Sequence, residues 1–93
     1  MTIEHLNETK NGYFIAVDND IQAGKMTYTW AGSDKFIIDH TEVFPEFEGK
    51  GVGKKLVMAA VDYARANDLK ILPLCPFAKA LFERTKEIQD VRF

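Results

Sequence analysis

The sequence is poor in several features that define common protein classes. Its only cysteine is Cys75, which excludes an internal disulfide and a cysteine-based metal site, and we expect no bound metal. No apolar run approaches the roughly 20 residues of a membrane-spanning helix. The segment Met1–Asn11 is mostly polar, so we expect no secretory signal. These absences predict a cytoplasmic protein.

The charge balance is equally unremarkable, with 12 Lys and Arg residues, 14 Asp and Glu residues and a net charge of −2. A protein that binds nucleic acid or anionic membranes generally carries a basic excess, so neither partner is expected. A length of 93 residues, 46% of them hydrophobic, suits one domain spanning residues 1–93. We expect this domain to be a monomer or a weak homodimer.

The N-terminal half has the alternation and turn chemistry of an antiparallel sheet. Turn signals are expected at Lys10–Gly12, Asp18–Asp20 and Ala31–Asp34. The strands between them are predicted at Ile3–Asn7, Tyr13–Val17, Ile21–Trp30 and Phe36–Phe44. Simple alternation along the last of these places one set of side chains on a common face, namely Phe36, Ile38, His40, Glu42 and Phe44.

The second half changes to helical spacing. Apolar residues recur through Gly51–Asn67 at intervals that predict an amphipathic helix. A buried strand is expected at Leu69–Leu74, a short helix at Ala78–Arg84 and a final strand at Asp90–Phe93. The predicted fold is therefore α+β, a compact mixed sheet in which an antiparallel meander is followed by a βαβ crossover and a short helix.

The segment Val43–Leu56 joins a strand to a helix through three glycines at alternate positions, Gly49, Gly51 and Gly53. The start of a helix offers unpaired N–H groups and a positive dipole end, which favour an anion such as phosphate. A Walker A loop requires a glycine where Glu48 stands and Ser or Thr where Lys55 stands, and a Rossmann fingerprint requires a different glycine spacing. Glycines alone are equally compatible with a simple tight turn.

The residues around these glycines carry a more specific signal. Val43, Pro45 and Glu46 precede them, and Leu56 follows on the first turns of the helix. This pattern resembles the acetyl-coenzyme A motif of the GNAT N-acetyltransferase superfamily. The resemblance extends through Phe36–Arg84. It is closest to a small, reduced GNAT-like family that has an Asp-His-Thr strand, here Asp39–Thr41, and a cysteine before the last helix.

The resemblance implies that acetyl-coenzyme A is the cosubstrate, with its pyrophosphate on backbone N–H groups of the Glu48–Lys54 turn. It also implies that the end of the preceding strand, near Val43, binds the pantetheine arm and polarises the thioester. The coenzyme-binding residues predicted on this basis are Val43, Phe44, Glu48, Gly49, Lys50, Gly51, Val52, Gly53, Lys54, Cys75 and Lys79.

Three departures from the superfamily pattern bear on activity. Glu48 stands where Gln or Arg is usual, and Phe82 replaces the tyrosine that often protonates the leaving thiolate. The two helices that usually follow the first strand and shape the acceptor pocket are missing. Only the turn near Lys10–Gly12 takes their place.

His40, Glu42 and Cys75 are the predicted catalytic residues. His40 has a suitable reference pKa to take a proton from an ammonium group, but a half-buried structural imidazole is an equally good interpretation. Glu42 is either a base or an exposed strand carboxylate. Cys75 either lies beside the coenzyme thiol, where His40 or the last helix would activate it, or is a small buried hydrophobic residue.

These residues support two functions. The first is an N-acetyltransferase that moves an acetyl group directly from acetyl-coenzyme A to a primary amine, either a small molecule or a protein. The second is a non-catalytic module that binds or senses the coenzyme, which the missing acceptor elements and Phe82 favour. A turn that binds only phosphate, or nothing, is a weaker third possibility.

Overall fold

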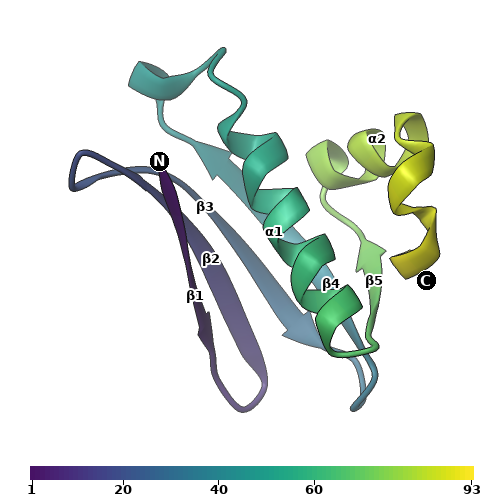
Figure 1. Ribbon diagram of the computed structural model, residues 1–93. Coiled ribbons are helices and arrows are strands. Elements are labelled where there is room, and N and C mark those ends of the chain that lie inside the picture. Colours follow the sequence, from purple (N-terminus) through teal and green to yellow (C-terminus); the bar gives the residue numbers. More distant parts are fainter.

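The computed structural model describes all 93 residues, Met1–Phe93. One five-stranded sheet, in the order β1-β2-β3-β4-β5, is crossed on one face by the long helix α1, with α2 beside it (Figure 1). No helix is long and apolar enough to cross a membrane. The elements are β1 Thr2–Asn7, β2 Asn11–Asp18, β3 Ile21–Trp30, β4 Lys35–Val43, the 3-10 helix η1 Pro45–Phe47, α1 Val52–Ala66, β5 Lys70–Pro73, α2 Pro76–Arg84 and the 3-10 helix η2 Lys86–Val91.

This topology confirms the predicted α+β class. Strands β1 to β4 form the antiparallel meander, and β4, α1 and β5 form the crossover, with β4 and β5 parallel. The hydrophobic core lies between the sheet and α1. Its largest fully buried side chains include Phe14, Tyr28, Phe36, Ile38, Leu56, Val57 and Val61. The opposite face of the sheet, which we call the open face, is covered by no helix.

Two of the predicted turns are confirmed, and one is displaced. Asn19 and Asp20 adopt left-handed conformations (φ 50° and 65°) between β2 and β3, as Asn and Asp tolerate. The first turn falls on Glu8–Lys10 instead of Lys10–Gly12, so Gly12 lies within β2. Glycine is needed there for close approach, because a Cβ atom would overlap the hydroxyl group of Tyr28.

The predicted final strand at Asp90–Phe93 is wrong. Asp90 and Val91 belong to η2, and only a single parallel bridge joins Arg92 to Ile71. The Arg65 side chain on α1 explains the difference, because its guanidinium donates to both carboxylate oxygens of Asp90 at 2.8 and 3.0 Å. This ion pair holds Asp90 against α1, so the segment does not continue as a strand along β5.

Strand β1 is held to the sheet by an aromatic and polar network around Tyr28. His5 stacks on Phe14, with ring centroids 4.1 Å apart, and its Nε2 lies 2.6 Å from the Tyr28 hydroxyl oxygen. That hydroxyl donates to Asn7 at 3.1 Å, and Trp30 donates to the same amide oxygen at 2.7 Å. Burial raises the pKa of Tyr28 to about 12, so its hydroxyl remains a donor, and burial lowers the pKa of His5.

A β-bulge in β4 overturns the predicted alternation of its side chains. Tyr28 pairs with Ile38, but Thr27 pairs with His40, so Asp39 is an extra residue in β4. Phe36 and Ile38 therefore point into the core, whereas beyond the bulge Thr41 is the residue that faces the helices. Because successive side chains alternate, His40 and Glu42 point to the open face, away from Phe36 and Ile38.

Strands β4 and β5 part at this bulge. Their parallel pairing covers Lys35–Ile38, and the remaining part of β4, Asp39–Val43, has no strand on that side. Pro73 ends β5 and has no N–H to continue the ladder. The N–H groups of Leu74 and Cys75 both donate to the Ile38 carbonyl, at 3.2 and 3.1 Å, as the chain turns away into α2. We call the resulting opening the β4–β5 gap.

Candidate functional site

The glycine-rich turn before α1 has an unusual backbone. Gly49 and Gly51 have φ values of +81° and +75°, a region that only glycine adopts freely, and Gly51 is the N-cap of α1. A Cβ atom at either position would meet nothing within 4 Å. Conformation, not crowding, therefore demands these glycines, and the space in front of them is open to a ligand.

Five backbone amides between Gly49 and Lys54 have no hydrogen-bond acceptor. The first backbone bond of the helix runs from Lys55 N–H to the Gly51 carbonyl, and no side chain caps the N-terminus. The unpaired N–H groups belong to Gly49, Gly51, Val52, Gly53 and Lys54. The amides of Glu48 and Lys50, which were also expected to face a phosphate, instead donate to the carbonyls of Pro45 and Phe47. Such a cluster of donors at a helix N-terminus suits an anion.

These amides border a cavity of about 320 Å³, which we call the turn cavity. Its lining includes seven of the residues predicted to bind the coenzyme, namely Val43, Glu48, Gly49, Gly51, Val52, Gly53 and Lys54. Phe47, Phe77 and Arg84 complete the lining. The other predicted binding residues, Phe44, Lys50, Cys75 and Lys79, lie outside it.

Phe77 and Phe47 are the aromatic members of this cavity that sequence reasoning missed. A Cβ atom at Gly53 would lie 2.6 Å from the Cζ atom of the Phe77 ring, so the glycine allows the first turn of α2 to rest against the first turn of α1. The ring is still 40% exposed, and it gives the cavity an apolar wall. The available signal was a large aromatic residue directly after Cys75 and Pro76, at the start of a helix.

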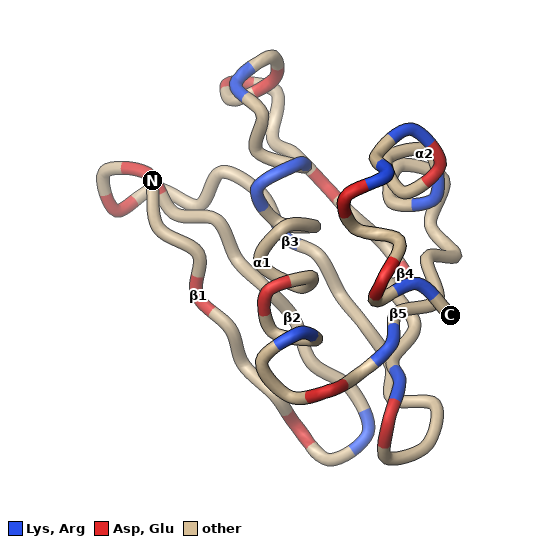
Figure 2. Tube along the Cα trace, turned by 45° about the vertical axis from the view of Figure 1, so that its right-hand side comes forward, with Lys and Arg blue, Asp and Glu red and all other residues tan.

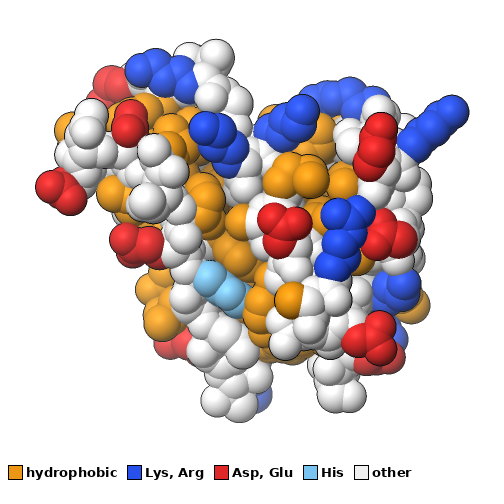
Figure 3. Space-filling model, viewed as in Figure 1, with side chains coloured by type: hydrophobic (Ala, Val, Ile, Leu, Met, Phe, Trp, Pro, Cys, Tyr) orange, Lys and Arg blue, Asp and Glu red, His pale blue; other side chains and the backbone are white.

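The charges around the turn cavity are mainly positive. Lys54 and Arg84 line it, and Glu48 contributes the one acidic side chain. Lys50 stands beside it, with its Nζ atom 5.4 Å from the centre of the Phe47 ring. Lys and Arg residues lie along the edge of the molecule formed by η1, the start of α1 and α2, with acidic residues between them (Figures 2 and 3). This distribution suits a ligand with several phosphates.

Cys75 lies at the helical side of the β4–β5 gap. It is the N-cap of α2, where its Sγ atom accepts from the Ala78 N–H at 3.3 Å, and it is only 4% exposed. Thr41 Oγ1 lies 3.2 Å from the same sulfur. Thr41 was noted in the sequence only as part of a motif. The structure makes it the β4 side chain that reaches Cys75.

His40 and Glu42 lie on the other side of the sheet from this thiol. Their cross-strand partners on the open face are Thr27 and Lys25. The hydrogen-bond partners of Cys75 are Thr41 and the Ala78 amide, so the expected activation of this thiol by His40 has no structural support. The predicted catalytic residues therefore flank the β4–β5 gap from opposite faces, with the thiol on one and the imidazole and carboxylate on the other.

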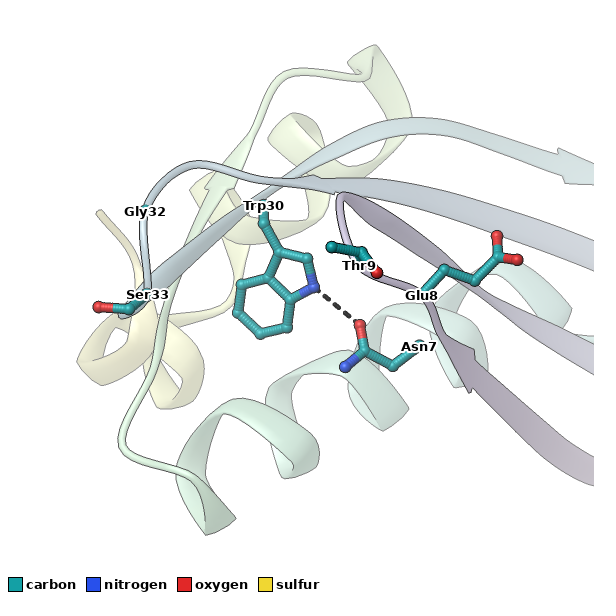
Figure 4. A pocket seen from close by; sticks show the side chains of 6 residues that line it. All are labelled: Asn7, Glu8, Thr9, Trp30, Gly32 and Ser33. Carbon is teal, nitrogen blue, oxygen red and sulfur yellow. Dashed lines mark hydrogen bonds between the residues drawn. The ribbon is translucent and has the colours of Figure 1, made fainter.

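A second cavity, of about 350 Å³, lies at the other end of the sheet and contains none of the predicted site residues. We call it the end cavity. It is lined by Asn7, Glu8, Thr9, Trp30, Gly32 and Ser33, from the β1–β2 and β3–β4 turns (Figure 4). The Trp30 indole donates to Asn7 across one wall, which ties this cavity to the network that holds β1.

Comparison with known proteins places this arrangement in a family. The model of the GCN5-related N-acetyl-transferase family matches residues 12–91, most of the chain. The chain belongs to this family. A GCN5-like protein from Staphylococcus aureus, whose structure was determined by NMR, is similar along nearly the whole chain. The two are 38% identical with a TM-score of 0.71, over 97% of this chain and 87% of that one. The family assignment confirms the predicted superfamily.

Two other similarities are narrower. Protein NATD1 of Xenopus tropicalis is 36% identical over 50 residues, which cover 54% of this chain and 46% of the frog protein. The match thus spans less than half of that relative. An acetyltransferase from Bacillus anthracis, crystallised with acetyl coenzyme A, shares the fold with a TM-score of 0.64 at 20% identity, over 84% of this chain and 47% of that one.

Proposed function

We propose that this protein is an acetyl-coenzyme A-dependent N-acetyltransferase that transfers the acetyl group directly to a primary amine. The observation that carries the proposal is the row of five unpaired N–H groups, from Gly49 and Gly51–Lys54, which opens onto the turn cavity. Membership of the GCN5-related N-acetyl-transferase family supports the same activity.

The residues present fit the coenzyme part by part. The unpaired amides and the helix dipole suit its pyrophosphate, and the Lys54 and Arg84 side chains add positive charge beside it. The Phe77 ring supplies an apolar contact. Beyond the cavity, the free edge of β4 at Asp39–Val43 offers backbone donors and acceptors to the amide groups of a pantetheine arm, as an added strand would use them.

The thioester would then lie in the β4–β5 gap, between Cys75 on the helical side and His40 and Glu42 on the open face. An ammonium group on the open face gives a proton to His40, and its nitrogen attacks the thioester carbonyl. Backbone N–H groups at the free edge of β4 stabilise the developing oxyanion. The nitrogen gives up its second proton, the carbon–sulfur bond breaks and the acetylated amine departs. The coenzyme thiolate takes up the proton released from nitrogen on the helical side, where Thr41 and Cys75 lie.

The position of Cys75 favours direct transfer over an acyl-cysteine intermediate. Its sulfur accepts a hydrogen bond from the Ala78 amide and contacts Thr41, and its side chain is nearly buried. His40, the predicted base, is on the opposite face of the sheet. A nucleophilic cysteine is usually activated by a neighbouring base, and no such base lies within hydrogen-bond reach of this sulfur, which leaves only the N-terminus of α2 to activate it.

Calorimetric titration with acetyl-coenzyme A tests the binding step. Gly51→Ala should weaken binding about tenfold or more, because alanine resists the left-handed conformation that aims the amides. Gly32→Ala is the matched control, since Gly32 also has a positive φ (97°) but lies in the β3–β4 turn. Equal effects of the two variants, or no binding by the wild type, would contradict the proposal.

A non-catalytic coenzyme sensor is the second candidate, and Phe82 favours it. Phe82 is fully buried in the core, so the position that often supplies a general acid in this superfamily contributes only packing here. Thiol release from acetyl-coenzyme A in the presence of primary amines separates the two functions. Tight binding without amine-dependent thiol release would identify a sensor.

A further inference from the structure

The open face of the sheet contains a third cavity, of about 330 Å³, which the proposed function has not used. We call it the open-face cavity. It lies over β2 and β3 beside the β1–β2 turn. The side chains that matter for recognition come from that turn and from three strands, namely Glu8, Tyr13, Lys25, Thr27, Thr29 and Asp39. A cavity of this size is at the lower end of the range for small-molecule sites.

The bulge in β4 connects this cavity to the β4–β5 gap. Asp39 is the extra residue of the bulge, and it directly follows Ile38, the last residue of β4 that pairs with β5. Its carboxylate turns toward β3, where it accepts a hydrogen bond of 2.6 Å from the Thr29 hydroxyl. One residue therefore borders the cavity at the point where the gap begins.

The strand register places the predicted base beside the same cavity. His40 pairs directly with Thr27, and Thr27 pairs with Tyr13 on the next strand, so these three side chains form one row across the open face. Glu42, Lys25 and Ile15 form the next row. An amine held against Thr27 would thus have the His40 imidazole as its neighbour on the side of the gap.

The lining has the chemistry of a site for a polar cation. The Asp39 and Glu8 carboxylates are acceptors for an ammonium group, and the hydroxyl groups of Thr27, Thr29 and Tyr13 both donate and accept. Lys25 also lines the cavity, and its Nζ atom lies over the Tyr13 ring, 4.5 Å from the ring centre. No large apolar surface is available inside for a hydrophobic acceptor.

We propose that the open-face cavity is the acceptor subsite and that it takes a small, hydroxylated primary amine, whose ammonium group binds Asp39 and whose hydroxyl groups bind the Thr27 and Thr29 side. This inference rests on the proposed acetyltransferase function. It places donor and acceptor on opposite faces of the sheet, with transfer through the β4–β5 gap. His40 then receives the proton of the bound amine.

Three matched compounds test this recognition. Serinol carries one ammonium and two hydroxyl groups, isopropylamine lacks the hydroxyls, and glycerol replaces the ammonium by a hydroxyl. With saturating acetyl-coenzyme A, we expect serinol to be acetylated with a KM about tenfold or more below that of isopropylamine, because isopropylamine makes no hydrogen bonds to the threonine hydroxyl groups. Equal KM values for the two amines would overturn the inference.

Two isosteric variants locate the site. Asp39→Asn should raise the KM for serinol about tenfold, since it removes the partner charge. Thr27→Val should abolish the preference for serinol over isopropylamine. Asp20→Asn, in the exposed β2–β3 turn, is the control and should change neither. The coenzyme would use only the backbone of β4 at Asp39, whereas Asp39→Asn and Thr27→Val change side chains on the open face. The dissociation constant of acetyl-coenzyme A should therefore stay within twofold of the wild type in every variant.

Amide NMR spectra with serinol provide a readout that does not depend on turnover. In the presence of coenzyme A, serinol should shift the amides of Thr27, Thr29 and Asp39, and glycerol should not. Shifts confined to Trp30 and Gly32 would assign the amine to the end cavity and overturn the inference, as would no shift at all. A protein that fails to bind acetyl-coenzyme A refutes the proposed function, whereas one that binds it but shows no serinol effect refutes the acceptor site alone.

Discussion

The two halves of β4 differ in pairing, burial and chemistry. Over Lys35–Ile38 the strand is bonded to β3 on one side and β5 on the other, and Phe36 and Ile38 are completely buried. Over Asp39–Val43 it is bonded only to β3, and no residue is fully buried. The first half is structural. The second carries the residues that flank the β4–β5 gap and leads into the glycine-rich turn.

A single extra residue separates these halves. The bulge at Asp39 reverses the side-chain pattern, so that Thr41 faces Cys75 while His40 and Glu42 face the open side. Bulges commonly re-aim side chains next to active sites. Strand β4 therefore both supports the core and borders a two-sided site, because the bulge and Pro73 end its pairing with β5 at the same level.

The largest effect is expected at His40, in the second half. His40→Gln should lower kcat for amine acetylation by about 10²- to 10⁴-fold, the usual contribution of a general base, with little change in stability because the side chain is exposed. His5→Gln provides the control, since His5 is the other histidine and lies in β1. Steady-state thiol release measures both. Retained activity in His40→Gln would remove the catalytic distinction between the two halves.

In the first half, the expected effect is on folding. Ile38→Ala should lower the free energy of unfolding by about 2–5 kcal/mol, as is typical for truncation of a buried aliphatic side chain. Thr41→Val, beyond the bulge, should cost less than about 1 kcal/mol because its site is only half-buried. Urea denaturation followed by Trp30 fluorescence compares them. Similar losses would show that the second half is as structural as the first.

A smaller effect is expected where α1 and α2 touch. Gly53→Ala would displace the Phe77 ring, and Phe77→Ala would remove it, so each should weaken acetyl-coenzyme A binding by about tenfold or less, on the order of 1 kcal/mol. Because both changes act through one ring, their effects in the double variant should be less than additive. Full additivity in calorimetric titrations would argue that Phe77 does not form the wall of the coenzyme site.

The smallest effect concerns pH and lies away from β4. Desolvation lowers the pKa of His5 from its ordinary value of 6.5. The unfolded chain therefore binds a proton more readily than the folded one. The neutral His5 side chain therefore contributes to stability above pH 6.5. This contribution is lost as the pH falls through the pKa of His5 in the folded protein. Unfolding free energies measured between neutral and acidic pH should show this loss, and His5→Gln should flatten it. An unchanged slope in the variant would assign the loss to other groups.

Much of the fold follows from local sequence patterns. The spacing from Val52 to Ala64 determines which face of α1 is buried, and Asn19 and Asp20 tolerate the left-handed turn that they form. Gly12 and the C-terminal segment were misassigned for a different reason. Both depend on contacts between residues far apart in the chain, with Tyr28 in one case and Arg65 in the other.

The candidate site divides in the same way. The glycine-rich turn was predictable because its residues are contiguous and their conformations are set locally. The bulge at Asp39 was not predictable, because it arises from a shift in the pairing register between β3 and β4. Nothing in the sequence of β4 alone marks its position. Phe77 and Thr41 join the site only through tertiary contacts with Gly53 and Cys75. The roles of His40, Glu42 and Cys75 remain predictions.

We propose that the unpaired amides of the glycine-rich turn bind the pyrophosphate of the coenzyme. Titration of the isotopically labelled protein with coenzyme A, followed by amide NMR, tests it most directly. We expect the largest shifts at Gly49 and at Gly51–Lys54, with smaller shifts along Asp39–Val43. Saturable binding that leaves those five amides unmoved would contradict it.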